Sequence, residues 1–243
     1  MSNTTIGPAY KGSRFWMQQI VNSIVLTKQF EKKIKTGKIE WISPIKANEN
    51  YKEYKLNWVQ KNTGEIISDI LNIKSSGVCS GKWKSLRPQW DAIGYVDNND
   101  GGRKIILVEA KAHLEEIKGS GCGAKKQGRS YLDIRNILMD THTSPSNNKK
   151  TDLNTTSIFK DNIWLGTYYQ TANRLAIWKK LNDEGFDTIL VFLNIVNDFT
   201  HIPTEISEWY REMPKGFIEL LGHTNLPKSI KTIYFDVNPN GFI

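Results

Sequence analysis

The fold is decided by Gln89-Trp90-Asp91-Ala92-Ile93-Gly94-Tyr95-Val96, a predicted strand followed by the turn Asp97-Asn98-Asn99-Asp100-Gly101-Gly102 and by a second strand, Arg103-Lys104-Ile105-Ile106-Leu107-Val108-Glu109-Ala110-Lys111-Ala112-His113. The Asn, Asp and Gly residues of the turn tolerate the positive φ angles that close a hairpin. The second strand is nearly all apolar, as in a buried central strand, yet it ends in Glu-Ala-Lys. Charged side chains at the end of a buried strand need a partner or a function.

The spacing of these charges brings two carboxylates together. Side chains alternate along a strand, so Glu109 and Lys111 share one face. If Asp97 pairs with Arg103 in an antiparallel hairpin, Asp91 lies directly opposite Glu109, with the two Cβ atoms about 4.5–5.5 Å apart. Two facing carboxylates repel unless a positive charge lies between them, and a divalent cation would supply that charge. A register shift of one or two residues would weaken this geometry.

These residues resemble the motif of the PD-(D/E)XK nuclease superfamily. In that motif an acidic residue on one strand is followed, on the next strand, by Asp or Glu, any residue, and Lys; Asp91, Glu109 and Lys111 match it. The chain departs from the motif in having Trp90 directly before the aspartate, with the proline further back at Pro88. The resemblance implies an α/β fold with a restriction-endonuclease-like core, in which helices flank a central mixed β-sheet.

Three longer strings resemble a family of uncharacterised bacterial proteins within that superfamily. They are Pro-Gln-Trp-Asp-Ala, Val-Glu-Ala-Lys-Ala-His and Tyr-Gln-Thr-Ala-Asn-Arg-Leu. This similarity runs from about Arg87 to the predicted strand near Val196. It implies a fold and a site but no particular substrate.

The resemblance also implies a reaction, the metal-dependent hydrolysis of a phosphodiester, with DNA as the expected substrate. Asp91 and Glu109 would bind Mg²⁺ or Mn²⁺, with the carbonyl oxygen of Ala110 as a third ligand. Lys111 would orient or deprotonate the attacking water, or stabilise the charged transition state. His113 lies on the same face but beyond the motif. It could contact the substrate, but we expect it to be a plain surface histidine.

The composition predicts one globular, basic domain over residues 1–243. Apolar residues make up 39% of the chain and charged residues 24%, which is typical of a globular protein. The sequence has no membrane-length apolar run and no signal-peptide pattern, so we expect a cytoplasmic protein without a membrane partner. Cys79 and Cys122 lack metal-type spacing and are expected to be free thiols. The chain could form a homodimer.

The net charge of +8 favours a polyanionic partner, with nucleic acid as the first candidate. The basic residues that we expect to line a positive cleft around the carboxylates are Lys82, Lys84, Arg87, Lys125, Lys126 and Arg174. Basic and aromatic residues also alternate over residues 48–59, which suits either a nucleic-acid grip or an amphipathic surface segment. Solvated loops are the alternative for the lysines. The glycine-rich stretch before Lys125 lacks the residue order of a nucleotide-binding loop.

Periodicity predicts the remaining elements. Helices are expected over residues 14–35, 65–74, 130–140, 161–182 and 205–221, and further strands over residues 38–45, 188–196 and 231–237. The helix over 161–182 is apolar almost all round, which is typical of a buried helix. Its early polar residues Gln170, Asn173 and Arg174 are therefore expected to face the site and bind substrate, unless they lie on a partly solvated face.

Two other functions stay open. The chain could be a nucleic-acid-binding or protein-interaction module that does not cleave, because a fold alone does not determine a function. Asp91, Glu109 and Lys111 could also form a purely structural ion-pair cluster, although such clusters are usually weak stabilisers. A titration with Mg²⁺ or Mn²⁺ separates these interpretations, because two acidic ligands bind a divalent ion and a salt-bridged cluster does not.

Overall fold

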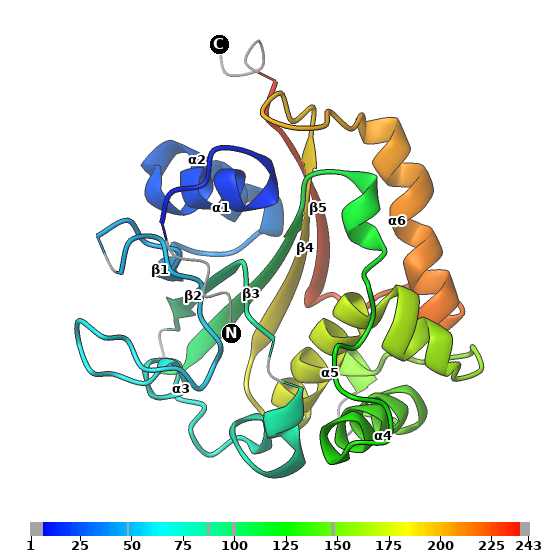
Figure 1. Ribbon diagram of the computed structural model, residues 1–243. Helices are drawn as coiled ribbons and strands as arrows, with labels where there is room; N and C mark the ends of the chain where they lie inside the picture. The colour runs from blue at the N-terminus through cyan, green and yellow to red at the C-terminus, as the bar shows by residue number, and fades with distance from the viewer. Residues whose placement is uncertain (1–6, 48, 87, 99–100, 147–148, 239–243) are drawn as a thin grey trace.

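A five-stranded mixed sheet forms the centre of the computed structural model, which describes residues 7–47, 49–86, 88–98, 101–146 and 149–238 (Figure 1). The strands are β1 (Glu40–Ser43), β2 (Ala92–Asp97), β3 (Arg103–Lys111), β4 (Thr188–Val196) and β5 (Ile230–Asp236). They lie in the order β1-β2-β3-β4-β5. The β1–β2 and β2–β3 pairs are antiparallel, whereas the β3–β4 and β4–β5 pairs are parallel. The predicted α/β class with a mixed sheet is confirmed.

The hairpin of β2 and β3 has the predicted register. Asp97 pairs with Arg103, and Ala92 with Val108. Continuing this register by one residue places Asp91, which directly precedes β2, opposite Glu109. Two of the predicted turn residues, at positions 99 and 100, lie outside the described part of the chain.

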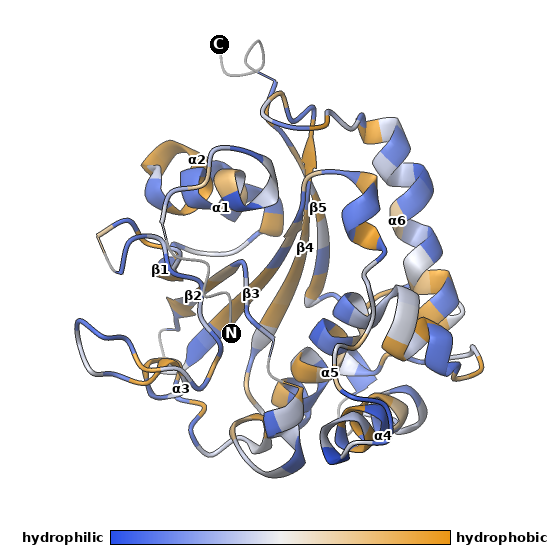
Figure 2. Ribbon diagram, viewed as in Figure 1, coloured by the Kyte–Doolittle hydropathy of each residue, from blue (hydrophilic) through white to orange (hydrophobic). Residues whose placement is uncertain are grey.

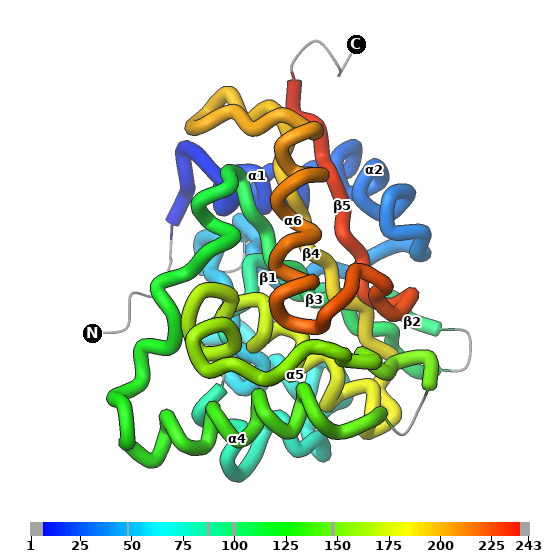
Figure 3. Tube along the Cα trace, turned by 90° about the vertical axis from the view of Figure 1, so that its right-hand side faces the viewer, coloured from blue at the N-terminus to red at the C-terminus, as the bar shows by residue number. Residues whose placement is uncertain are grey.

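Helices cover both faces of the sheet, as Figures 1 and 3 show from two directions. On one face lie α1 (Gly12–Asn22) and α2 (Ile24–Ile34), and on the other lie α5 (Tyr169–Asp183) and α6 (Ile206–Leu221), with α4 (Arg129–Thr143) packed against α5. The central strands contribute alternate side chains to the two apolar clusters. This burial on both faces explains why β3 and β4 are apolar almost throughout, as the colours in Figure 2 show.

The single helix expected over residues 14–35 is wrong, because the chain turns a corner between α1 and α2. Ser23 at the corner has an extended backbone (φ −116°, ψ 120°), and its Oγ accepts a hydrogen bond from the backbone N–H of Leu26. Asn22 holds the corner to another segment by donating a hydrogen bond to the carbonyl of Pro44 (2.8 Å). Serine favours such an N-cap over a helix interior. Apolar periodicity continues across the corner and hides it.

The helix expected over residues 161–182 also has two parts. A π-helical turn, Asn162–Thr167, precedes α5, and Gly166 within it has a non-helical backbone (φ −107°, ψ −112°). Backbone N–H groups of Gly119 and Cys122 donate hydrogen bonds to two carbonyls of this turn (2.9 and 2.7 Å). The turn therefore anchors the loop that follows β3. Such π-helical turns are frequent at functional sites.

The other elements lie close to their predicted positions. The prediction for residues 65–74 gives only the short helix α3 (Ile67–Ile70), whereas α4, α6, β4 and β5 match their predicted ranges closely. Short 3-10 turns occupy Gly77–Cys79, Gly81–Ser85, Leu114–Ile117 and Lys149–Thr151. Cys79 and Cys122 are not joined by a disulfide. None of the helices in the described ranges has the length and apolar character that a membrane crossing requires.

Candidate active site

The three motif residues meet at one end of the β2–β3 hairpin, on the face of the sheet that α5 covers. Asp91 directly precedes β2, and Glu109 and Lys111 lie at the C-terminal end of β3. All three line a polar cavity of about 600 Å³. Its other walls come from α1, from the segment before β2, from the loop after β3 and from the first turns of α5.

Glu109 is buried, and both of its carboxylate oxygens are paired with cations. Oε1 lies 2.7 Å from Nζ of Lys111. Oε2 accepts a hydrogen bond from Nε of Arg174 at 2.7 Å and forms an ion pair with Nη2 of the same residue at 2.6 Å. Burial acts to raise the pKa of Glu109, but Arg174 and then Lys111 outweigh it and lower that pKa. Glu109 is therefore ionised at neutral pH.

Asp91 is held by a single hydrogen bond. Its Oδ2 accepts the backbone N–H of Ala110 at 2.7 Å, and its Oδ1 has no hydrogen-bonding partner within the described ranges. Burial raises the pKa of Asp91 well above its ordinary value, and the carboxylates of Glu109 and Glu53 raise it further, against a smaller opposing effect of Lys111. A carboxylate whose charge is disfavoured in this way gains from a cation beside it.

Lys111 is a charged ammonium in this arrangement. Its Nζ donates hydrogen bonds to Oε1 of Glu109 and to Oε1 of Gln170, both at 2.7 Å. Burial acts to lower the pKa of Lys111, but Glu109 and then Asp91 outweigh it and raise that pKa. A lysine that holds its proton this firmly suits charge stabilisation or the orientation of water better than proton abstraction.

Arg174 connects β3 to the segment before β2. Besides its two contacts with Glu109, its Nη2 donates a hydrogen bond to the carbonyl of Gln89 at 2.9 Å. The guanidinium carbon lies 4.8 Å from the centre of the Trp90 ring, within the range of a cation–π contact. Trp90, where the chain departs from the motif, therefore supports the arginine. Sequence reasoning missed this contact because nothing local to either segment indicates it.

The oxygen atoms around Asp91 fit Mg²⁺ or Mn²⁺. In an extended strand the N–H and C=O of one residue point the same way, so the carbonyl of Ala110 faces the side of Asp91 to which its N–H donates. Carboxylate and carbonyl oxygens are the ligands that these ions prefer. The described residues contain no group of three or more His, Cys, Asp or Glu side chains suited to a metal ion. The ligands would therefore be Asp91, the Ala110 carbonyl and Oε1 of Glu109, which would exchange Lys111 for the ion.

The predicted polar residues of α5 do face this cavity. Gln170, Asn173 and Arg174 all line it, and Gln170 contacts Lys111 directly. Asn173 is 5% exposed, and its Oδ1 is buried without a hydrogen-bond partner in the described structure. Arg174 is already bonded to Glu109, so its predicted contact with phosphate stays a prediction.

The predicted basic residues other than Arg174 lie away from the cavity or outside the described structure. Lys82 is bonded to Asp140 (2.9 Å) and lines a different, smaller cavity. Three more residues of the predicted set are exposed and do not line the candidate site: Lys84, Lys125 and Lys126. Arg87 lies outside the described residues. Charges in the cavity wall are balanced, with Lys111, Lys118 and Arg174 against Asp91, Glu109 and Glu116. The positive cleft that the sequence predicts is therefore not found in the described cavity wall.

His113 occupies neither of its two predicted environments. It does not line the cavity, and its side chain is only 14% exposed, so it is not a plain surface histidine. Its Nε2 lies 3.2 Å from Oε1 of Glu116, and its ring lies 5.3 Å from that of His201. Its place after the end of β3 turns it toward the loop that follows β4.

Glu53 is a buried acidic residue that the sequence interpretation missed. It is 6% exposed, and its Oε2 accepts a hydrogen bond from Nε2 of Gln89 at 2.9 Å. It lies near enough to Asp91 to raise the pKa of that residue. The segment around it was expected to be a nucleic-acid grip or a surface segment, but Lys52, Glu53 and Tyr54 are all buried. The alternation of basic and aromatic residues gave no signal for this burial.

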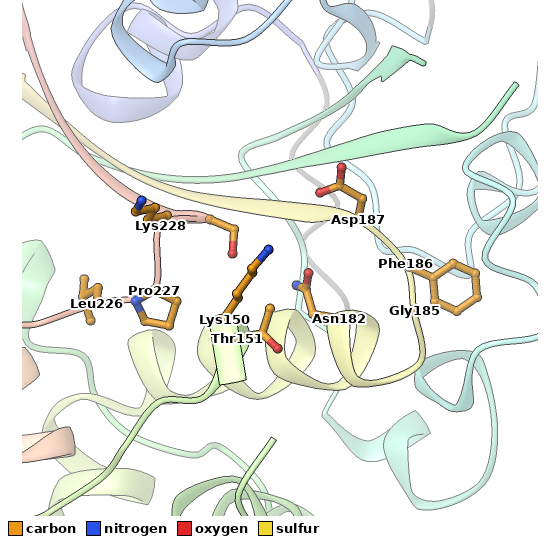
Figure 4. A pocket seen from close by; sticks show the side chains of 10 residues that line it. Lys150, Thr151, Asn182, Gly185, Phe186, Asp187, Leu226, Pro227 and Lys228 are labelled. Carbon is orange, nitrogen blue, oxygen red and sulfur yellow. The ribbon is translucent and has the colours of Figure 1, made fainter. Parts of the chain in front are cut away.

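A second cavity of about 680 Å³ lies near the start of β4, and Figure 4 shows the residues that line it. None of the motif residues is among its described lining residues. Lys150, Asn182 and Asp187 line it. Asp187 is the one carboxylate among its described lining residues, and it is paired with Nζ of Lys104 (3.4 Å). Its described lining contains no pair of facing carboxylates, so it lacks the metal-binding arrangement of the first cavity.

The wall of the first cavity thus holds an ionised glutamate, an aspartate with one oxygen that lacks a partner in the described structure, and a charged lysine. This set can bind a divalent cation and can stabilise negative charge that develops beside it. No protein-family model, curated protein or solved structure matches this chain.

Proposed function

We propose that this protein is a metal-dependent nuclease that hydrolyses phosphodiester bonds in DNA. The observation that carries the proposal is the pairing of β2 with β3, which brings Asp91 and Glu109 to facing positions with Lys111 on the same wall. We also propose that the α/β fold is restriction-endonuclease-like. It is supported by an antiparallel hairpin that continues into parallel strands, with helices on both faces.

The roles of the residues follow from their contacts. Asp91, the Ala110 carbonyl and Glu109 would hold Mg²⁺, which supplies an activated water and neutralises phosphate charge when bound. Lys111 stabilises the negative charge that develops on the phosphate and orients the water, because its raised pKa keeps it protonated. Gln170 fixes the lysine through the hydrogen bond to its ammonium group.

A non-cleaving module is the second candidate, and one observation favours it. Both oxygens of Glu109 are already neutralised by Lys111 and Arg174, so the cluster is balanced at that residue without a metal ion. Asp91 is the feature against a purely structural role, because its charge is disfavoured and its Oδ1 lacks a partner in the described structure.

Cleavage assays with plasmid, linear and single-stranded DNA and with RNA test the proposal directly. We expect DNA cleavage with Mg²⁺ or Mn²⁺ and none in a chelator. Lys111→Ala is expected to lower the rate by at least ~100-fold, the low end of what a positioned catalytic group contributes. Lys28→Ala is the matched control, because Lys28 is an exposed lysine on α2, which contributes no residue to the described wall of this cavity. Cleavage that survives chelation, or a wild-type rate for Lys111→Ala, would contradict the proposal.

A further inference from the structure

Arg174 uses its guanidinium group to close one side of Glu109. Its Nε and Nη2 both contact Oε2 of Glu109, at 2.7 and 2.6 Å. The arginine is 8% exposed, and its guanidinium is held over Trp90. A guanidinium keeps its charge at any ordinary pH, so it cannot leave as a neutral group. A metal ion at Oε2 would have to displace a buried, stacked cation that contacts this oxygen through two nitrogens.

Lys111 closes the other oxygen of Glu109 less firmly. It makes one contact with Oε1, at 2.7 Å, from a flexible four-carbon side chain that is 13% exposed. Its Nζ also has a second acceptor, Gln170, which can keep the ammonium group satisfied when Oε1 is released. Oε1 is therefore the oxygen of Glu109 that can exchange its cation.

Arg174 also determines how the two acidic segments meet. Nη2 donates to the carbonyl of Gln89, which lies two residues before Asp91, while the same nitrogen contacts Glu109 at the end of β3. One rigid, planar group therefore bridges the backbone that carries Asp91 and the side chain of Glu109. A lysine in its place would have a single nitrogen and could not reproduce this fork.

We infer that Arg174 is a positioning residue that leaves Glu109 a single exchangeable oxygen, so that the site takes one divalent cation per chain. The inference rests on the proposed metal-dependent function and adds to it a stoichiometry and a residue that enforces it. Arg174 acts here through Glu109 and Gln89, and needs no contact with substrate.

Binding of Mn²⁺ to the full-length chain, without nucleic acid, tests this inference. Free Mn²⁺ is measured by electron paramagnetic resonance, and the heat of binding by calorimetry. We expect one Mn²⁺ per wild-type chain. Arg174→Lys is expected to weaken Mn²⁺ binding by about 10–100-fold, the usual effect of losing a residue that orients a metal ligand. Arg135→Lys is the matched control, because Arg135 makes a similar contact with the Asp161 carboxylate on the surface, and it is expected to bind Mn²⁺ as the wild type does.

Thermal melting of each variant separates loss of the site from loss of the fold. Two Mn²⁺ ions per wild-type chain, or wild-type affinity in a folded Arg174→Lys variant, would overturn the inference. The wild-type stoichiometry decides the matter even if Arg174→Lys does not fold. One bound Mn²⁺ without cleavage would leave the role of Arg174 intact and overturn the nuclease proposal, whereas cleavage with two bound ions would do the reverse. Absence of Mn²⁺ binding would overturn both.

Discussion

Asp91 is the residue whose charge the surrounding structure opposes most clearly. Because its folded-state pKa is raised, its ionisation destabilises the folded protein. This cost is absent below the ordinary pKa of an aspartate, near 4, and grows as the pH rises toward the raised value. A cation bound beside Asp91 would remove the cost. If the proposed cation binds there, the same residue would link the stability of the protein to metal binding.

We accordingly predict that Asp91→Asn stabilises the metal-free protein at pH 7. Asparagine keeps an oxygen that can accept the N–H of Ala110 but carries no charge. A gain of about 1 kcal/mol would raise the melting temperature by about 2–4 °C in a chain of this size. Melting curves at pH 7 and pH 4 measure it, and the gain should shrink at pH 4. Added Mg²⁺ should stabilise only the wild type. A lower melting temperature of the variant at pH 7 would show that Asp91 belongs to a stabilising ion-pair cluster.

At this scale the sequence predicts the site in part. The register of β2 against β3 is as predicted, and it brings Asp91, Glu109 and Lys111 to one cavity wall, because side chains alternate along paired strands with a period of two residues. Arg174 and Glu53 approach from distant segments, and their contacts depend on how α5 and the chain before α3 pack on the sheet. No local pattern carries that information.

At the scale of elements, the π-helical turn before α5 fixes the loop after β3. Gly121 in this loop has a φ of +84°, and a Cβ atom there would lie only 2.9 Å from the carbonyl oxygen of Leu165. The neighbouring Gly119 lines the cavity and lies beside Gln170, which holds Lys111. The conformation of the loop is thereby coupled to the position of the lysine.

Gly121→Ala is therefore expected to displace this loop. Positive φ alone costs an alanine roughly 1–2 kcal/mol, and the clash with the turn adds to it. We expect a free energy of unfolding lower by about 2 kcal/mol or more, because the clash adds to the cost of the positive φ. The cleavage rate should fall by about 10-fold or more, since small misplacements in a site have large effects. Denaturant titration and cleavage assays measure the two. Gly123→Ala is the control, because a Cβ atom at Gly123 has no neighbour within 4 Å. Equal behaviour of the two variants would separate the loop from the site.

The interruptions at Ser23 and Gly166 explain why the sequence predicts the helices less accurately than the strands. Ser23 and Gly166 interrupt two helices whose apolar periodicity runs on without a break. Periodicity records which side chains face the core, and a corner or a π-helical turn can preserve that facing while the backbone changes direction. β4 was predicted closely because burial on both faces leaves an uninterrupted apolar run with sharp ends.

At the scale of the whole molecule, the excess positive charge lies outside the candidate site. The chain carries a net charge of +8, yet the described cavity wall is balanced. In the proposed function, contacts with a polyanion would then come from exposed lysines outside the described cavity wall, and the site itself would handle a single phosphate. Lys125 and Lys126, on the loop that leads away from the cavity wall, are exposed candidates.

DNA binding is accordingly expected to weaken steeply with salt. Each lost phosphate contact makes the negative slope of log K against log salt shallower by about 0.9, so replacing both Lys125 and Lys126 with alanine should reduce its magnitude by nearly 2. Fluorescence anisotropy over a range of salt concentrations, without divalent ions, measures the slope. The matched control replaces Lys28 and Lys32 with alanine. Both are exposed on α2, at the opposite face of the sheet, and their replacement removes the same amount of charge. Equal slopes for the two double variants would indicate attraction by net charge alone.

The contacts that Arg174 makes with Glu109 and Gln89 can form only late in the synthesis of the chain. Arg174 follows Glu109 by 65 residues in the chain. During synthesis both carboxylates and Lys111 leave the ribosome well before the arginine that fixes them. The hairpin alone therefore carries all three motif residues but lacks the guanidinium that joins Glu109 to Gln89. The site is complete only once α5 has been synthesised and has packed on the sheet, so a nascent chain passes through a stage in which the motif exists without its geometry.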